Sequence, residues 1–191
     1  LIIVFYFETL PNYRTGGSIG FSAIGIIAYV WFCLEFILMA RPKILDQTFG
    51  MDKVLKFHIR NSIVMVLLSI MHARLLRIRG LSYNTTIKLG SGALTLYMLL
   101  ILLGFIFMLT TKLDDMKIYS KIKGFFINKL KIRYNFSKVI HNLTIIATVF
   151  LYGHVMRTSS TEHSMILKIM YSGYFFAGLL FWIYHKFIKP I

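Results

Sequence analysis

The chain has 191 residues, of which 57% are hydrophobic and only 15% are charged, and its formal net charge is +15. Soluble domains average about 25% charged residues, so this composition excludes an ordinary water-soluble domain. The basic residues lie mainly between long apolar runs, which is typical of membrane topology signals rather than of nucleic-acid binding. We therefore expect an integral membrane protein that contacts lipid and does not bind nucleic acid.

Apolar segments long enough to cross a bilayer as helices recur along the chain. Each is expected to be helical, because hydrocarbon cannot satisfy unpaired backbone groups. The apolar stretch Leu1–Phe7 predicts the end of a further, incomplete first helix. The sequence thus predicts an all-α membrane protein, a six-helix transmembrane bundle forming one domain over residues 1–191. Its full spans are expected at Ile19–Ala40, Val54–Leu76, Gly90–Leu109, Phe136–Met156 and Ser164–Ile183.

Lysine and arginine are unevenly divided between the two sides of this predicted bundle. The segments Arg41–Lys56, Lys112–Lys138 and Lys186–Ile191 share one side and hold fourteen basic residues, against seven on the opposite side. The positive-inside rule places the richer side in the cytoplasm. We expect a multi-pass protein of the plasma membrane with both ends of the bundle cytoplasmic.

Four histidines lie inside the apolar spans, two on each of two spans. His58 and His72 are 14 residues apart, and His141 and His154 are 13 apart. An ionisable side chain at membrane depth is costly and indicates a functional site. At 1.5 Å per residue, each pair extends over ~20 Å. Each helix therefore offers one imidazole near the cytoplasmic side and one nearer the outer side.

Two such helices side by side would hold two planar metallocofactors, one above the other, because neutral imidazole is a common metal ligand. Two haem b groups fit best, since haem b accepts two axial histidines and needs no cysteine. The chain has one cysteine, Cys33, and no C-x-x-C-H motif. The alternative is a cofactor-free membrane transporter or scaffold in which the histidines are hydrogen-bonded core residues.

The 13-residue spacing on the later span raises a geometric difficulty. At ~100° per residue it leaves His141 and His154 ~140° apart around the helix, whereas 14 residues leave only ~40°. We therefore expect this span to bend, to change pitch, or to present its two histidines from different directions. Gly153, beside His154, is a candidate position for such a distortion.

Basic residues near the four histidines are candidate partners for haem propionates, which are carboxylates. Lys56 and Arg60 lie close to His58 in the sequence, and Arg74 and Arg157 follow the two outer histidines. Snorkelling to lipid headgroups is the alternative role for these side chains.

Three further residues complete the candidate set. His163 and His185 fall at the ends of spans, where we expect interfacial positions. Together with Arg74 and Arg157, His163 is also a candidate for an outer acceptor pocket. Glu35, within an apolar span, is expected to pair with a neighbouring helix.

Two stretches of the sequence carry a family resemblance. One is AYVWFCLEFILMARPKILDQTFGMDKVLKFH, from Ala28 to His58, with its continuation to His72; the other is KVIHNLTIIATVFLYGH, which ends at His154. Together they resemble the ferric reductase-like transmembrane domain shared with NADPH oxidases. The resemblance implies an inner haem on His58 and His141. It implies an outer haem on His72 and His154.

The same resemblance implies an oxidoreductase that passes electrons from cytoplasmic NAD(P)H, through FAD, to an outer acceptor such as a ferric chelate or oxygen. The sequence has no G-x-G-x-x-G motif for a nucleotide. We therefore expect FAD and NAD(P)H on a further domain or a separate subunit that docks at Lys112–Lys138, a basic segment equally suited to anionic lipid. A haem subunit of a sulfoxide reductase-type system is the alternative. Surplus positive charge on the outer side favours an anionic ferric chelate.

Overall fold

The computed structural model describes Ile3 and residues 16–40, 42–78, 84–108, 120–121, 124–125, 128 and 139–188. Except for Ile3, the predicted first segment Leu1–Phe7 lies outside these residues, as does most of Lys112–Lys138. Regular structure in the described part of the chain is helical. The helices are α2 (Gly16–Met39), α3 (Lys43–Phe49), α4 (Met51–Ile78), α5 (Thr85–Met108), α9 (Thr144–Met156), α10 (Ser159–Glu162), α11 (Met165–Ile183) and the π-helical η1 (Tyr184–Ile188).

Five segments of the described chain are long and apolar enough to cross a membrane, and they coincide with the five full spans predicted from hydropathy. This agrees with an all-α membrane protein. Some helices extend beyond the predicted bounds: α4 begins at Met51 rather than Val54 and ends at Ile78 rather than Leu76, and α5 begins at Thr85 rather than Gly90. Hydropathy marks only the part of a helix that suits hydrocarbon, whereas backbone hydrogen bonding continues the helix into the polar interface.

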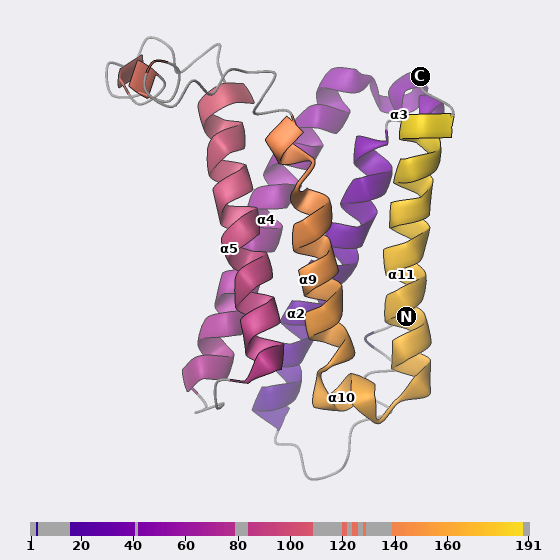
Figure 1. Ribbon diagram of the computed structural model, residues 1–191. Helices are drawn as coiled ribbons and strands as arrows, with labels where there is room; N and C mark the ends of the chain where they lie inside the picture. The colour runs from indigo at the N-terminus through magenta and orange to yellow at the C-terminus, as the bar shows by residue number, and fades with distance from the viewer. Residues whose placement is uncertain are drawn as a thin grey trace.

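The spanning helices form a ring in which each packs beside the next along the chain. Thus α4 lies between α2 and α5, α9 lies between α5 and α11, and α11 packs back on α2 (Figure 1). We call the end with α3, the start of α4 and the end of α11 the α3 end. The opposite end, with α10 and the starts of α5 and α11, is the α10 end (Figure 1).

A sharp connection joins α3 to α4 at the α3 end. Gly50 has φ +78°, a left-handed conformation that glycine adopts without steric cost. Its N–H donates to the carbonyl of Asp46 over 2.8 Å, which ends α3, and its own carbonyl accepts from Val54 over 3.2 Å, which begins α4. This glycine therefore fixes where the long helix α4 starts.

The contact between α2 and α11 is close and partly polar. The Tyr29 ring meets the Tyr171 ring edge-on at 5.3 Å, and the Tyr29 hydroxyl donates to the Tyr171 carbonyl over 2.8 Å. Further along, a Cβ placed on Gly178 would collide with the carbonyl of Cys33. Small residues at such crossings let helix backbones approach closely in a membrane, so α11 is held tightly against α2.

A second core cluster joins α2, α4, α5 and α9 halfway through the bundle. The Phe32 ring stacks on the Tyr97 ring at 4.1 Å, and the Tyr97 hydroxyl lies 2.5 Å from Thr148 Oγ1. Met65 of α4, only 1% exposed, belongs to the same cluster together with Ala147. Met65 is equally far in sequence from the two histidines of α4, so this cluster forms a packed layer between two halves of the bundle.

Candidate functional site

The four histidines within the spans meet in two pairs, each made by one residue near or on α9 and one on α4. The ring centres of His58 and His141 are 6.1 Å apart, with planes at 88°. Those of His72 and His154 are 6.5 Å apart, with planes at 77°. We call the first the α3-end pair and the second the α10-end pair. Since α4 packs mainly on α2, and α9 mainly on α5, the imidazoles meet across the interior of the ring.

The unequal histidine spacing is accommodated by a break in the later span. Residues 139–141 are helical, Asn142 and Leu143 form a turn, and α9 begins only at Thr144. The N–H groups of residues 142, 143 and 145 each bond the carbonyl three residues earlier. A segment with three residues per turn rotates ~20° more per residue than an α-helix. This extra rotation reduces the angle around the helix axis between His141 and His154.

This break lies away from Gly153, the position expected from the sequence. Gly153 is inside the regular helix α9, and a Cβ there would make ordinary contact with Leu89 at 3.5 Å. The tight turn changes the direction of the His141 side chain at the start of the span, whereas His154 lies on an undistorted helix. The expected change of pitch is therefore present, at Asn142 and Leu143.

In the α10-end pair, both imidazoles are held by backbone carbonyls of neighbouring helices. His72 Nδ1 is 2.7 Å from the Phe21 carbonyl of α2, and His154 Nδ1 is 2.7 Å from the Thr86 carbonyl of α5. A carbonyl only accepts, so in each ring Nδ1–H donates and Nε2 keeps its lone pair. This is the tautomer that a metal ligand needs, with the second ring nitrogen anchored by the protein.

Glycines make room for the same two rings. A Cβ on Gly25 would lie 2.8 Å from the His72 ring, and a Cβ on Gly90 would lie 2.8 Å from the His154 ring. Each glycine is one helical turn after the carbonyl that binds the same ring. The same arrangement thus occurs between α2 and α4 and between α5 and α9: a backbone carbonyl and a glycine four residues later both contact one imidazole of the neighbouring helix.

In the α3-end pair, a buried carboxylate takes the place of a carbonyl. His58 Nδ1 donates to Glu35 Oε2, and Asn61 Nδ2 donates to Glu35 Oε1. Glu35 is 8% exposed. The expectation that Glu35 pairs with a neighbouring helix is confirmed, with α4 as that helix. His141 Nδ1 is buried and has no hydrogen-bond partner among the described residues.

The separation within each pair suits one metal ion held by two imidazoles. Histidine–metal bonds are about 2 Å long, so two bonds extended to the ring centres cover about 6 Å, close to the 6.1 Å and 6.5 Å found. No group of three or more His, Cys, Asp and Glu side chains suited to a metal occurs among the described residues. Two imidazoles at this separation form a donor set that would fit haem, whose macrocycle supplies the other ligands of its iron.

The basic residues expected near the propionates are all exposed. Lys56 and Arg60 lie on α4 near His58, and Arg74 lies on the same helix beyond His72. Arg157 directly follows α9, and its carbonyl accepts a hydrogen bond from Thr86 Oγ1 over 3.1 Å. Thr86 therefore contacts the end of α9 twice, through its hydroxyl to the Arg157 carbonyl and through its carbonyl to His154. Roles as propionate partners stay predictions.

The other two described histidines do not join a pair. His163 is exposed after α10, and its Nδ1 donates to the Ser159 carbonyl over 2.7 Å. His185 lies in η1, with its ring 4.5 Å from that of Phe181, and its Nδ1 is buried without a partner in the described chain. Both lie at ends of the bundle, in agreement with interfacial positions.

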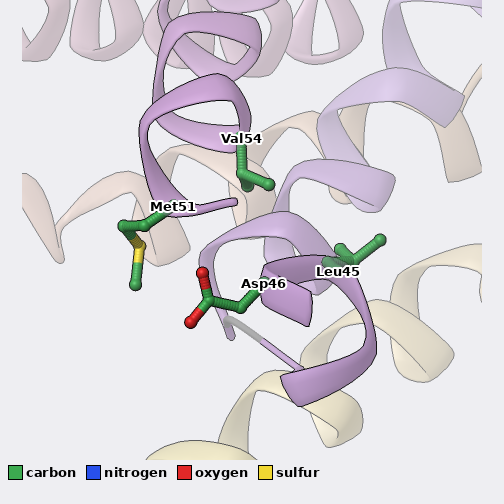
Figure 2. Close-up of a pocket in the computed structure, with 4 residues that line it drawn as sticks. All are labelled: Leu45, Asp46, Met51 and Val54. Atoms are coloured by element: carbon green, nitrogen blue, oxygen red, sulfur yellow. The ribbon is translucent and has the colours of Figure 1, made fainter. Parts of the chain in front are cut away.

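A shallow apolar surface leads from α3 to His58. A shallow depression is lined by Leu45 and Asp46 of α3 and by Met51 and Val54 of α4 (Figure 2). A neighbouring shallow depression shares the two α4 residues, and its lining is completed by Leu38, Met39, Leu55 and His58. The α3-end pair is therefore approached from this end through apolar side chains.

Comparisons with protein-family models, curated proteins and solved structures find no match for this chain. The resemblance to the ferric reductase-like domain therefore stays a prediction from the sequence. Function is inferred from the two histidine pairs.

Proposed function

We propose that this protein is the membrane component of an oxidoreductase and transfers electrons across the bilayer through two bis-histidine b haems. One haem would bind the α3-end pair and the other the α10-end pair. One observation carries the proposal: two imidazole pairs lie at different depths of a transmembrane bundle, with ring centres 6.1 Å and 6.5 Å apart. Both separations suit one metal between two rings.

The hydrogen bonds of the imidazoles favour ligation over a purely structural role. Metal-bound histidines almost always donate their second ring nitrogen to a carboxylate or a backbone carbonyl. His58 does so to Glu35, His72 to Phe21 and His154 to Thr86. A cofactor-free bundle, by contrast, does not require imidazoles to face each other in pairs while three of the four donate Nδ1–H to the protein.

Two haem sites at different depths would divide electron transfer across the membrane into shorter steps. The histidines of α4 are 14 residues apart, which corresponds to ~21 Å along a helix, within a hydrocarbon core of ~30 Å. A bound haem would supply an iron that accepts and releases one electron. The protein supplies the ligands and a water-excluding layer between them, in which Phe32, Tyr97 and Met65 are packed.

The charge distribution supports an orientation with the α3 end in the cytoplasm. Electrons would then enter at the α3-end pair from FAD and NAD(P)H on a further domain or subunit that contacts Lys112–Lys138. They would leave at the α10 end, where Arg74, Arg157 and His163 are exposed, to a ferric chelate or oxygen. A sulfoxide reductase-type haem subunit would use the same ligands with a different partner.

Haem content of purified variants tests the proposal. Protein extracted from membranes in detergent should show a reducible, low-spin b-type spectrum and two haems per chain. The variants His72→Ala and His141→Ala should each retain one haem. His163→Ala and His185→Ala are matched controls because these histidines lie outside the pairs, and both should retain two. A colourless wild-type protein with no extractable haem would contradict the proposal and favour a cofactor-free transporter or scaffold.

A further inference from the structure

The two histidine pairs differ in the groups that accept hydrogen bonds from them. In the α10-end pair both acceptors are neutral backbone carbonyls, from Phe21 and Thr86. In the α3-end pair the acceptor is the carboxylate of Glu35, held on its other oxygen by Asn61. A charged side-chain carboxylate therefore accepts a hydrogen bond from one pair, whereas only neutral backbone carbonyls accept hydrogen bonds from the other.

We propose that Glu35 lowers the reduction potential of the α3-end haem below that of the α10-end haem and thereby directs electrons from the α3 end to the α10 end. This inference rests on the proposed function. It assigns Glu35 as a positioning residue that acts through His58. The transfer moves one electron between the two centres, with the flavin as its source, and breaks no bond.

The physical reason is the basicity of the ligand. A carboxylate that accepts the Nδ1–H bond draws the proton away from the imidazole and makes Nε2 a stronger electron donor. A stronger donor stabilises the more positive, oxidised iron, which lowers its potential. The side chains of Glu35 and His58 are both largely buried, so water screens the carboxylate weakly. Neutral carbonyls have a smaller effect on the α10-end pair.

Asn61 acts in the opposite sense on the same carboxylate. It lies three residues after His58, so both side chains project from the same face of α4 toward Glu35 of α2. The Asn61 N–H group donates to Oε1, which withdraws electron density from the carboxylate and leaves Oε2 for His58. Without this donor, Glu35 would attract the His58 proton more strongly.

A redox titration of the purified holoprotein tests the inference. The two haem components are followed by absorbance, and His141→Ala, which lacks the α3-end haem, identifies the α10-end component. Glu35→Gln should increase the equilibrium constant for reduction of the α3-end haem at least tenfold. This corresponds to a rise in its reduction potential of about 59 mV for a one-electron couple, and the potential of the α10-end haem should not change. Asn61→Leu should shift the α3-end component in the opposite direction.

Opposite shifts from these two variants are not expected of residues that merely support the fold. If Glu35→Gln keeps both haems and neither potential moves, the inference is wrong while the proposed function stands. If Glu35→Gln loses the α3-end haem, Asn61→Leu decides: a lowered potential supports the inference and an unchanged one overturns it. A wild-type protein without haem would overturn the proposed function and this inference together.

Discussion

Gly25 of α2 lies against the imidazole of His72 on α4, so close that a Cβ at the glycine would approach two ring atoms to 2.8 Å. One turn earlier on α2, the carbonyl of Phe21 accepts the Nδ1–H bond of the same ring. The position of His72 is therefore set by the neighbouring helix from two sides. The same arrangement recurs at Gly90 and His154, which makes both glycines testable.

Gly25→Ala and Gly90→Ala should each displace an imidazole of the α10-end pair and reduce the haem content from two to one per chain. The added methyl group must move the ring, because the backbone of a packed helix yields little. Haem extraction and the absorbance spectrum of purified protein measure the loss. Alanine normally stabilises a helix interior by about 0.5–1 kcal/mol relative to glycine, so general helix weakening would not explain it.

The same helices provide matched controls for these two glycines. A Cβ placed on Gly20 of α2 or on Gly104 of α5 would meet nothing within 4 Å. Gly20→Ala and Gly104→Ala should therefore keep two haems. Full haem content in Gly25→Ala would show that the ring has room to move and that the glycine is not required to seat it.

The turn at Asn142 and Leu143 sets the direction of His141. Inserting one alanine after Leu143 should rotate His141 by ~100° relative to α9 and shift it ~1.5 Å along the axis. We expect loss of the α3-end haem and retention of the α10-end haem, because His154 stays on an unchanged helix. An alanine inserted after His163, between α10 and α11, serves as control and should keep both haems. Equal losses from the two insertions would argue against a specific role for the turn.

The hydroxyl of Tyr97 stabilises the layer between the two pairs. Tyr97→Phe removes its hydrogen bond to Thr148 and should lower the free energy of unfolding by about 1 kcal/mol. The cost stays small because Thr148 Oγ1 still donates to the Thr144 carbonyl over 2.8 Å. Thermal unfolding in detergent measures the change, with Tyr29→Phe in the other core cluster for comparison. Haem content should stay at two, and loss of haem would give Tyr97 a role beyond packing.

Exposed arginines at the α10 end should favour negatively charged electron acceptors. Arg157→Ala is expected to slow reduction of an anionic ferric chelate severalfold at low ionic strength, and less in high salt, because exposed charges are screened. Reduction of a neutral acceptor should be unaffected. Lys53→Ala, at the exposed start of α4, removes a charge at the opposite end and should change neither rate. A salt-independent effect of Arg157→Ala would indicate a structural role.

Much of the architecture follows from the sequence because hydrocarbon imposes strong local rules. An apolar run of about 20 residues must satisfy its own backbone and becomes a helix. The spans containing Met65 and Tyr97 are recognised for that reason without knowledge of their neighbours. The depth of His58 and His72 follows equally directly, since the helical rise converts their spacing into distance along the membrane normal.

Only the tertiary structure decided which groups meet. Three features depend on how one helix packs against another: the hydrogen bond from His58 to Glu35, the contact of His72 with Gly25, and the direction of the His141 side chain. Such contacts join residues far apart in the chain and are set by crossing geometry and side-chain packing, for which apolar spans carry no periodic signal. Hydropathy therefore determined the spans and the depth of the histidines, whereas helix packing determined the surroundings of each imidazole.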